Sequence, residues 1–196
     1  MGTEKYLNDV KKLFEKSPVV SYNSIQKIVL YKKGSKKYAK MLVHYLLSKG
    51  IIKKLAKGYY TQKEELSLAV FCFQPAYLGL QDALSHYNLW EQETIPIIIT
   101  TRKIRPGIRN ILWQNVLVRR IDKKYFFGIN YIQDDKSAIP YSDIEKTFID
   151  MIYFNEPLDK EVISEFKHKI DFKKLKRYLK NYPKMIRKKV NNVLER

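Results

Sequence analysis

Lysine recurs through one stretch of the chain, from Ser35 to Thr61, at spacings that suit contact with phosphate groups. Lys36, Lys37 and Lys40 crowd the first turns of a predicted helix, where they oppose the positive end of the helix dipole. A helix selected only for stability would carry acids there. A helix that faces phosphates tolerates the reversal because the anion comes from outside. The chemistry that this pattern predicts is electrostatic binding of a nucleic-acid backbone.

Two predicted elements position these lysines. Ser35 is a good N-cap and Gly50 a good left-handed residue for a helix whose buried stripe is Ala39, Leu42, Val43, Leu46 and Leu47. The β-prone runs 51–55 and 59–61 then flank Gly58 and predict a hairpin. Two earlier helices are expected, over 4–16 and from Asn23 or Ser24 to Leu30. Three helices and a basic hairpin predict a winged helix-turn-helix.

The expected DNA contacts are the cap and first turns of the third helix together with the hairpin, or wing. Lysines bind phosphates and so supply affinity more than sequence choice. This helix has no Arg for the common bidentate contact to guanine, so base readout would fall to Tyr38, Ser35 or His44. The expected contact residues are Ser35, Lys36, Lys37, Tyr38, Lys40, His44, Lys53, Lys54 and Lys57.

The net charge of +18 is distributed unevenly. Residues 1–63 carry 15 basic and 3 acidic side chains, residues 64–155 carry 10 and 11, and residues 156–196 carry 13 and 6. The excess therefore lies on the predicted DNA-binding segment and on the tail, which favours a polyanionic partner, although a lysine-rich host proteome would also give a basic tail. The tail is expected to be helical, with Asp171 as a cap. It offers a second basic surface for nucleic acid or a partner protein, or else a solvated face, formed by Lys173, Lys174, Lys176, Arg177 and Lys180.

The middle of the chain predicts an α+β domain with a sizeable core. Expected helices cover 77–90 and 143–154, and expected strands cover 95–101, 111–121, 125–131 and 139–141, with Asp122-Lys123-Lys124 as a turn. The apolar run 66–73 contains the lone Cys72, which is expected to be an inert core thiol. The predicted division is a winged helix over 1–63, an α+β antitoxin or regulatory domain over 64–155, and a basic helical tail over 156–196.

Catalytic constellations are weak in this sequence. Asp134-Asp135 with Glu145-Lys146 could form a metal-dependent nuclease centre, but that site needs carboxylates and a lysine converging on one cation, and here Glu and Lys are adjacent in a predicted helix. Ser85-His86 and Ser164 with His168 have no acid at convincing spacing, and the 7 glycines form no phosphate loop. We expect no enzyme activity, no metal and no cofactor. The sequence has no apolar run of membrane-spanning length and no signal peptide at its start, so a cytoplasmic protein is expected, without a membrane partner.

The order of motifs resembles the AbiEi-type antitoxin family, predicted regulators of viral defence. The segment YAKMLVHYLLSKGIIKKLAKGYY (38–60) resembles that family's winged-helix start. PAYLGLQDALSHYNLW (75–90), IPIIITT (95–101) and YFFG (125–128) resemble its following helix and strands, and IPYSDIEKTFIDMIYF (139–154) resembles its Glu-Lys-x-x-x-Asp helix, here Glu145, Lys146 and Asp150. The likeness covers about residues 20–155. The sequence departs from the family in its third helix, which has Lys where some Arg is expected.

The resemblance implies a repressor of its own operon and an antitoxin of a type IV toxin–antitoxin (abortive infection) system, whose nucleotidyltransferase-like toxin need not bind it directly. A homodimer on inverted repeats in its own promoter is the expected mode of binding double-stranded DNA. Two alternatives from other classes remain open. The chain could be an RNA-binding or ribosome-associated winged-helix module, in which case structured RNA should outcompete duplex DNA. It could also be a metal-dependent nuclease in residues 120–150.

Overall fold

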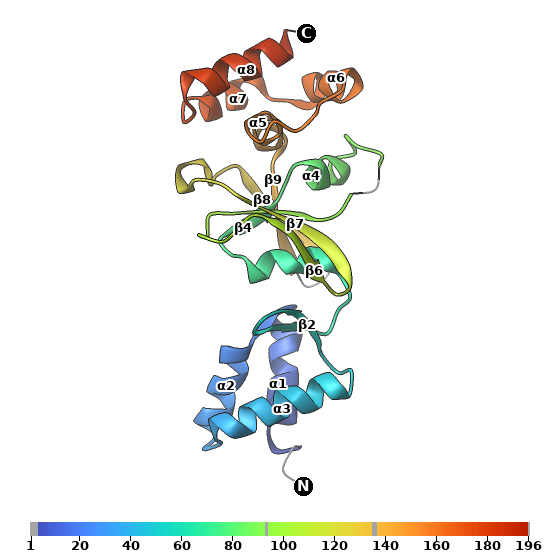
Figure 1. The fold of residues 1–196 in the computed structure, drawn as a ribbon, viewed down its shortest axis with the longest axis vertical. Coiled ribbons are helices and arrows are strands. Elements are labelled where there is room, and N and C mark those ends of the chain that lie inside the picture. The colour runs from blue at the N-terminus through green and yellow to red at the C-terminus, as the bar shows by residue number, and fades with distance from the viewer. Residues whose placement is uncertain (1–3, 93, 135–136, 196) are drawn as a thin grey trace.

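The computed structural model describes residues 4–92, 94–134 and 137–195. The molecule is elongated, with an N-terminal group of helices at one end, a six-stranded sheet in the middle and the C-terminal helices at the other end (Figure 1). The protein therefore has an α+β fold, as the sequence predicts. None of the helices in the described part of the chain has the length and apolar character that a membrane crossing needs.

The N-terminal part contains three helices and a small three-stranded sheet. Its elements are α1 (Glu4–Lys16), β1 (Val20–Ser21), α2 (Tyr22–Tyr31), α3 (Lys36–Ser48), β2 (Lys53–Ala56) and β3 (Tyr59–Thr61). The predicted first helix and third helix are confirmed. The second begins earlier than predicted, because Ser21 rather than Asn23 or Ser24 is the cap and its Oγ accepts a hydrogen bond from the Ser24 N–H. The sequence did not reveal β1, since two residues form no pattern, yet β1 pairs with β3 in the order β1-β3-β2.

Both ends of α3 follow from local chemistry. The Ser35 Oγ accepts from the Tyr38 N–H at 3.1 Å, which is the predicted N-cap. After the helix, the Gly50 N–H donates to the Leu47 carbonyl and the Ile51 N–H to the Leu46 carbonyl, while Gly50 has φ of +66°. This is the Schellman arrangement, in which a left-handed glycine ends the helix. The helix is therefore fixed at both ends by residues that the sequence identifies.

One hydrophobic core holds the three helices together. Ala39, Leu42, Val43 and Leu46 of α3 are buried, as the helical spacing predicts, whereas Leu47 of the same predicted stripe is half-buried. They pack with residues of α1, α2 and the small sheet, including Val10, Ile25, Val29, Ile52 and Tyr60. The turn between α2 and α3 passes so close to α2 that a Cβ on Gly34 would lie 2.6 Å from Val29 Cγ1. Only glycine therefore fits there without a shift of the two helices.

The middle sheet has the strand order β6-β7-β5-β4-β9-β8. Pairs β7/β5 and β4/β9 are parallel, and the other neighbours are antiparallel. Its elements, with the short helices between them, are η1 (Leu66–Cys72), β4 (Ala76–Leu78), α4 (Gln81–His86), β5 (Ile97–Thr100), β6 (Gly107–Ile111), β7 (Gln114–Arg120), η2 (Lys123–Tyr125), β8 (Ile129–Asp134) and β9 (Ser137–Ser142).

The sheet is covered on both faces, which explains why its central strands are continuously apolar. On one face Tyr77, Ile97 and Ile99 pack against α4 and the C-terminal helices. On the other face Leu78 and Ile98 pack against η1 and against Leu55 of β2. Successive residues of a strand point to opposite faces, so a strand buried on both faces shows no alternation.

The structure corrects three predicted elements of this region. The predicted helix 77–90 is wrong at its start, where Ala76–Leu78 forms the buried strand β4 and only 81–86 is helical. The predicted strand 111–121 is interrupted by a turn at Leu112 and Trp113, so it belongs to two strands, β6 and β7. Of the predicted strand 125–131, only the part from Ile129 onward is a strand, because Tyr125 ends the short helix η2.

The C-terminal helices are α5 (Ile144–Tyr153), α6 (Lys160–Lys169), α7 (Phe172–Leu179) and α8 (Lys184–Leu194). Asp143 caps α5 and Asp171 caps α7. Helices α6–α8 bury Phe166, Leu175 and Ile186 in the same core as Tyr77 and Phe148. Helices α6–α8 therefore pack as a layer on the core that also contains α5.

Candidate nucleic-acid interface

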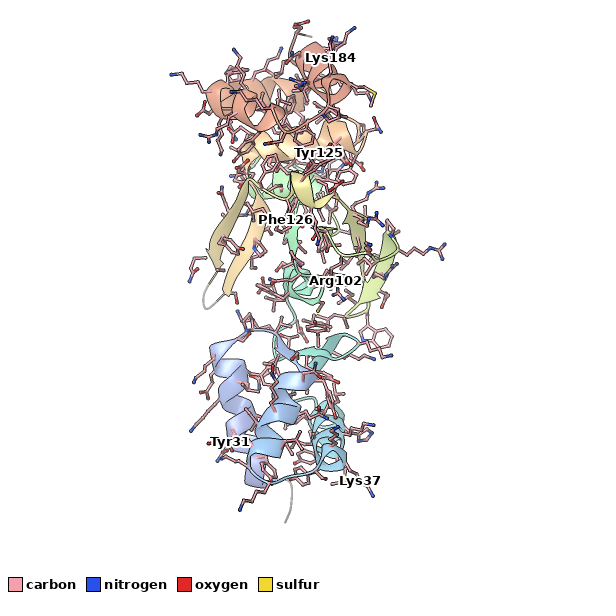
Figure 2. All side chains as sticks on the ribbon, turned by 90° about the vertical axis from the view of Figure 1, so that its left-hand side faces the viewer. Tyr31, Lys37, Arg102, Tyr125, Phe126 and Lys184 are labelled. Atoms are coloured by element: carbon pink, nitrogen blue, oxygen red, sulfur yellow. The ribbon has the colours of Figure 1, made fainter. Side chains whose placement is uncertain are left out.

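The outer face of α3 is basic. Lys36, Lys37, Lys40, Met41 and His44 are all exposed, whereas Ala39, Leu42, Val43 and Leu46 are buried on the other side of the helix. Positions 37, 40, 41 and 44 follow helical spacing, so their side chains line one surface. No acidic residue occurs in α3, so no i,i+4 partner offsets the lysines within the helix. Figure 2 shows Lys37 at the N-terminal end of the molecule, far from Lys184 of α8.

Tyr38 and Ser35, two of the three residues predicted to read bases, have partners within the chain. Tyr38 is half-buried, and its ring packs edge-on against Tyr6 with centroids 4.9 Å apart. Tyr38 therefore joins α3 to α1 instead of lying on the outer stripe. The Ser35 hydroxyl is exposed but already accepts the Tyr38 N–H as the cap. His44 is the one predicted reader whose side chain lies on the outer stripe.

The β2–β3 hairpin presents two of its three predicted lysines to solvent. Lys54 and Lys57 are exposed, while Lys53 is half-buried and forms an ion pair with Glu64. Between these lysines, Leu55 is buried in the core under the middle sheet. The hairpin is thus anchored to the middle sheet by Leu55 and leaves Lys54 and Lys57 exposed to solvent.

A groove of about 950 Å³ separates this hairpin from the β6–β7 hairpin of the middle sheet. Its walls are the end of α3, residues 52–57 and 64 on one side, and residues 110–114 on the other. Trp113 at the β6–β7 turn is 94% exposed. Sequence reasoning missed this element because neither Leu112 nor Trp113 is a turn residue, so the run appeared to be one strand. The sequence feature that could have predicted the turn is the single Trp, which lies between amide side chains in an otherwise apolar run.

A second basic groove, of about 740 Å³, lies where the parallel strands β5 and β7 end. Arg102, Lys103, Arg120 and Lys123 line it, and Asp122 is its acidic residue. Arg102, labelled in Figure 2, donates from Nη1 to the Cys72 carbonyl at 3.0 Å. The near-neutral total charge of residues 64–155 concealed this cluster, because the other acids of that segment lie elsewhere in the sequence.

One of the five residues predicted for the second basic surface, Lys174, is not exposed in the structure. Lys173, Lys176, Arg177 and Lys180 are exposed. Lys174 instead turns toward the core, with its Nζ 2.7 Å from Glu145 Oε2 and 3.1 Å from Asp143 Oδ2. Burial disfavours its charge, but hydrogen bonds to these two carboxylates raise the pKa of Lys174 above its ordinary value. Lys174 therefore fastens α7 to α5, and four of the five predicted residues remain available at the surface.

Glu145, Lys146 and Asp150 belong to a buried polar network. Lys146 and Asp150 have no exposed side-chain surface and form an ion pair, and the Tyr77 hydroxyl donates to Asp150 Oδ2 at 2.7 Å. The Lys146 ammonium also lies 5.4 to 6.0 Å from the ring centroids of Tyr77, Phe127 and Tyr182. Burial lowers the pKa of Lys146 and raises the pKa of Asp150, and the opposite charge of each partner counteracts that shift.

This network leaves the nuclease arrangement unsupported. Glu145 Oε1 accepts the Asp171 N–H at 2.9 Å and its other oxygen contacts Lys174. Asp134 is the last residue of β8, and Asp135 lies outside the described residues. Among the described residues, no group of three or more His, Cys, Asp or Glu side chains is placed to hold a metal ion. Cys72 is buried, and burial raises the pKa of its thiol to about 12.

Comparison with known proteins yields a likeness of fold. No protein-family model matches the chain, and no curated protein matches it in sequence. The crystal structure of the RV2827C protein from Mycobacterium tuberculosis is similar over 97% of this chain and 76% of that one, with a TM-score of 0.64. The two chains are 12% identical, so the likeness extends to the α+β fold and carries no function.

Proposed function

We propose that the protein is a DNA-binding transcriptional regulator whose residues 1–63 form a winged helix-turn-helix. In this proposal α3 enters the major groove and the β2–β3 hairpin is the wing that follows the backbone. The observation that carries the proposal is the outer stripe of α3, where exposed lysines repeat at helical spacing with no acid in the helix. Lys54 and Lys57 extend the same charge to the wing.

The regulator would act in the cytoplasm, as a homodimer on inverted repeats in its own promoter. The further role, as the antitoxin of a type IV toxin–antitoxin system, rests on the resemblance of the sequence motifs to the AbiEi-type family. In that role the cognate nucleotidyltransferase-like toxin need not bind this protein.

A gel-shift and salt titration tests the DNA-binding proposal. The probes are duplex DNA from directly upstream of the coding sequence, a scrambled duplex of the same composition and an RNA hairpin of equal charge. The upstream duplex should bind most tightly, and the preference should survive about 150 mM salt. The logarithm of the binding constant should fall with the logarithm of salt concentration by about 0.9 for each phosphate neutralised.

Two variants locate the interface. Replacing Lys36 and Lys37 together by alanine should weaken binding to every duplex and reduce the salt slope by about 2, since each lysine neutralises about one phosphate. Lys11→Ala is the matched control, because Lys11 is exposed on α1 rather than α3. Equal and salt-labile binding to all three probes would contradict the regulator proposal. Tighter binding to the RNA hairpin would favour an RNA-binding module instead.

A further inference from the structure

The turn of the β6–β7 hairpin combines backbone strain with extreme exposure. Leu112 and Trp113 both have left-handed backbones, with φ of +49° and +66°. Two-residue hairpin turns of this kind strongly favour Asn and Gly, because a side chain in the left-handed region is costly. Leu112 is half-buried and packs on the core below, whereas the Trp113 indole is 94% exposed. Packing accounts for Leu112 at its strained position, but packing within this chain does not account for Trp113.

The side chains around Trp113 are amides. Asn110 and Asn115 face each other across the two strands, and Ile111 faces Gln114. Asn110, Gln114 and Asn115 are all exposed. Asn and Gln read base edges, and apolar side chains that project from a rigid element act as wedges between base steps in the minor groove. The tip thus carries side-chain chemistry for base contact that the outer face of α3 offers at His44 alone.

The tip is held in a fixed position beside the proposed wing. Leu55 of the wing and Ile111 and Val116 of the β6–β7 hairpin are buried in one core. The intervening groove is walled by lysines 53, 54 and 57 on one side and by residues 110–114 on the other. In Figure 1 the β6 strand lies next to the β2 hairpin, on the side of the sheet that faces the N-terminal helices. The proposed wing and the β6–β7 tip therefore line opposite sides of one groove.

We propose that the β6–β7 tip is a second, base-reading contact of the DNA interface. Trp113 enters the minor groove that adjoins the major groove occupied by α3, and Asn110, Gln114 and Asn115 contact base edges beside it. This inference rests on the proposed function, because it takes the duplex to lie on α3 and the wing. In this arrangement the β6–β7 tip of the middle sheet selects the base sequence, and the N-terminal lysines supply the affinity for the phosphate backbone.

Tryptophan fluorescence tests the contact directly, because the chain has two tryptophans. Trp90 is half-buried against the core, so Trp90→Phe leaves Trp113 as the single reporter. Its emission should be quenched when the upstream duplex is added, and acrylamide should quench it less effectively in the saturated complex than in the free protein. A Trp113 that stays equally accessible in that complex overturns the inference.

Trp113→Gly separates a binding role from a structural one. Glycine suits the left-handed backbone, so the thermal midpoint should not fall, whereas affinity for the upstream duplex should fall about tenfold, as for loss of one good base contact. The matched control is Tyr131→Ala, which removes a 69% exposed aromatic ring from β8 at the opposite edge of the same sheet and should leave affinity unchanged. Equal losses in the two variants would overturn the inference.

A base substitution tests the assignment to the minor groove. Replacing every G·C pair of the duplex by I·C removes only the guanine 2-amino group, which projects into the minor groove. This base substitution should change the affinity of the wild-type protein by a larger factor than it changes the affinity of the Trp113→Gly variant. Identical responses would overturn the minor-groove contact. If Trp113→Gly retains full affinity while the Lys36 and Lys37 variant loses it, the hairpin inference fails and the proposed function stands. If no duplex binds, both fail.

Discussion

The buried ion pair between Lys146 and Asp150 allows a sharp prediction about stability. Both side chains are fully buried, one turn apart on α5, and the Tyr77 hydroxyl donates to Asp150. Replacing Asp150 by valine leaves an ammonium without its counter-charge and a hydroxyl without its acceptor. Loss of one partner of a buried pair costs about 3–5 kcal/mol, and an orphaned buried hydroxyl costs about 1–3 kcal/mol more. The single change should therefore remove a large share of a total stability of roughly 5–15 kcal/mol.

The loss of stability should be smaller when the Lys146 charge is removed together with Asp150. In the double variant Lys146→Met with Asp150→Val, neither charge of this pair remains and the Tyr77 hydroxyl alone loses its acceptor, for a cost of about 1–3 kcal/mol. Adding Tyr77→Phe removes that hydroxyl and should restore stability to within about 2 kcal/mol of wild type, because apolar replacements of a complete buried network are often neutral. The coupling energy between the two charges should then be about 3 kcal/mol.

Urea unfolding followed by tryptophan fluorescence measures these differences. Trp90 packs against the core that contains Tyr77 and Phe148, whereas Trp113 is exposed and reports little. The free energy of unfolding should be determined for the four proteins of the Lys146–Asp150 cycle and for the triple variant, with unchanged urea dependence as the check on two-state behaviour. Additive single-variant effects, or a double variant less stable than Asp150→Val, would refute the reasoning.

The remaining predictions concern one backbone contact and one carboxyl group. Gly34→Ala should lower stability by about 1–3 kcal/mol, because the new Cβ meets the Val29 side chain and carbonyl at 2.6 and 2.8 Å; an unchanged thermal midpoint would contradict that packing. Burial raises the pKa of Asp82 to about 7, although its carboxylate accepts the Ile97 N–H. Between about pH 4 and 7 the folded state then holds a proton that the unfolded chain has lost, so stability should fall as pH rises through this window. The fall should be on the order of 3–4 kcal/mol at most and absent from Asp82→Asn, and parallel pH profiles for the two proteins would refute it.

The N-terminal elements could be predicted because their signals are local. Ser35 caps α3 and Gly50 ends it through bonds to residues three to five positions away, and the spacing of Ala39, Leu42, Val43 and Leu46 identifies the buried face. The same spacing places Lys37, Lys40 and His44 on the outer face. Helical geometry alone connects these residues, so the sequence by itself determined which surface α3 would expose.

Packing between distant segments determined the elements that the local sequence pattern did not predict correctly. Leu78 and Ile98 are buried because η1 and the β2–β3 hairpin cover one face of the sheet while α4 and α5 cover the other, and a strand covered on both faces loses its alternation. Helix propensity over 77–90 therefore gave the wrong element at Ala76–Leu78. Likewise, the sequence predicted that Tyr38 and Lys174 lie at the surface. In the structure the Tyr38 ring packs against Tyr6 of α1. Lys174 forms ion pairs with the carboxylates of Glu145 and Asp143.

The residues of the proposed interface also divide into those that the sequence identifies and those that only the tertiary structure brings together. The sequence by itself determined its lysines, because charge and helical period are properties of neighbouring residues. Only the tertiary structure brought Trp113 and its amide neighbours to the edge of the groove beside Lys54, since that proximity depends on Leu55 and Ile111 sharing one core although more than fifty positions separate them along the chain. Contacts between distant segments carry no periodic signal, and the hydrophobic packing that creates them is non-directional, so the fold had to fix which surfaces meet.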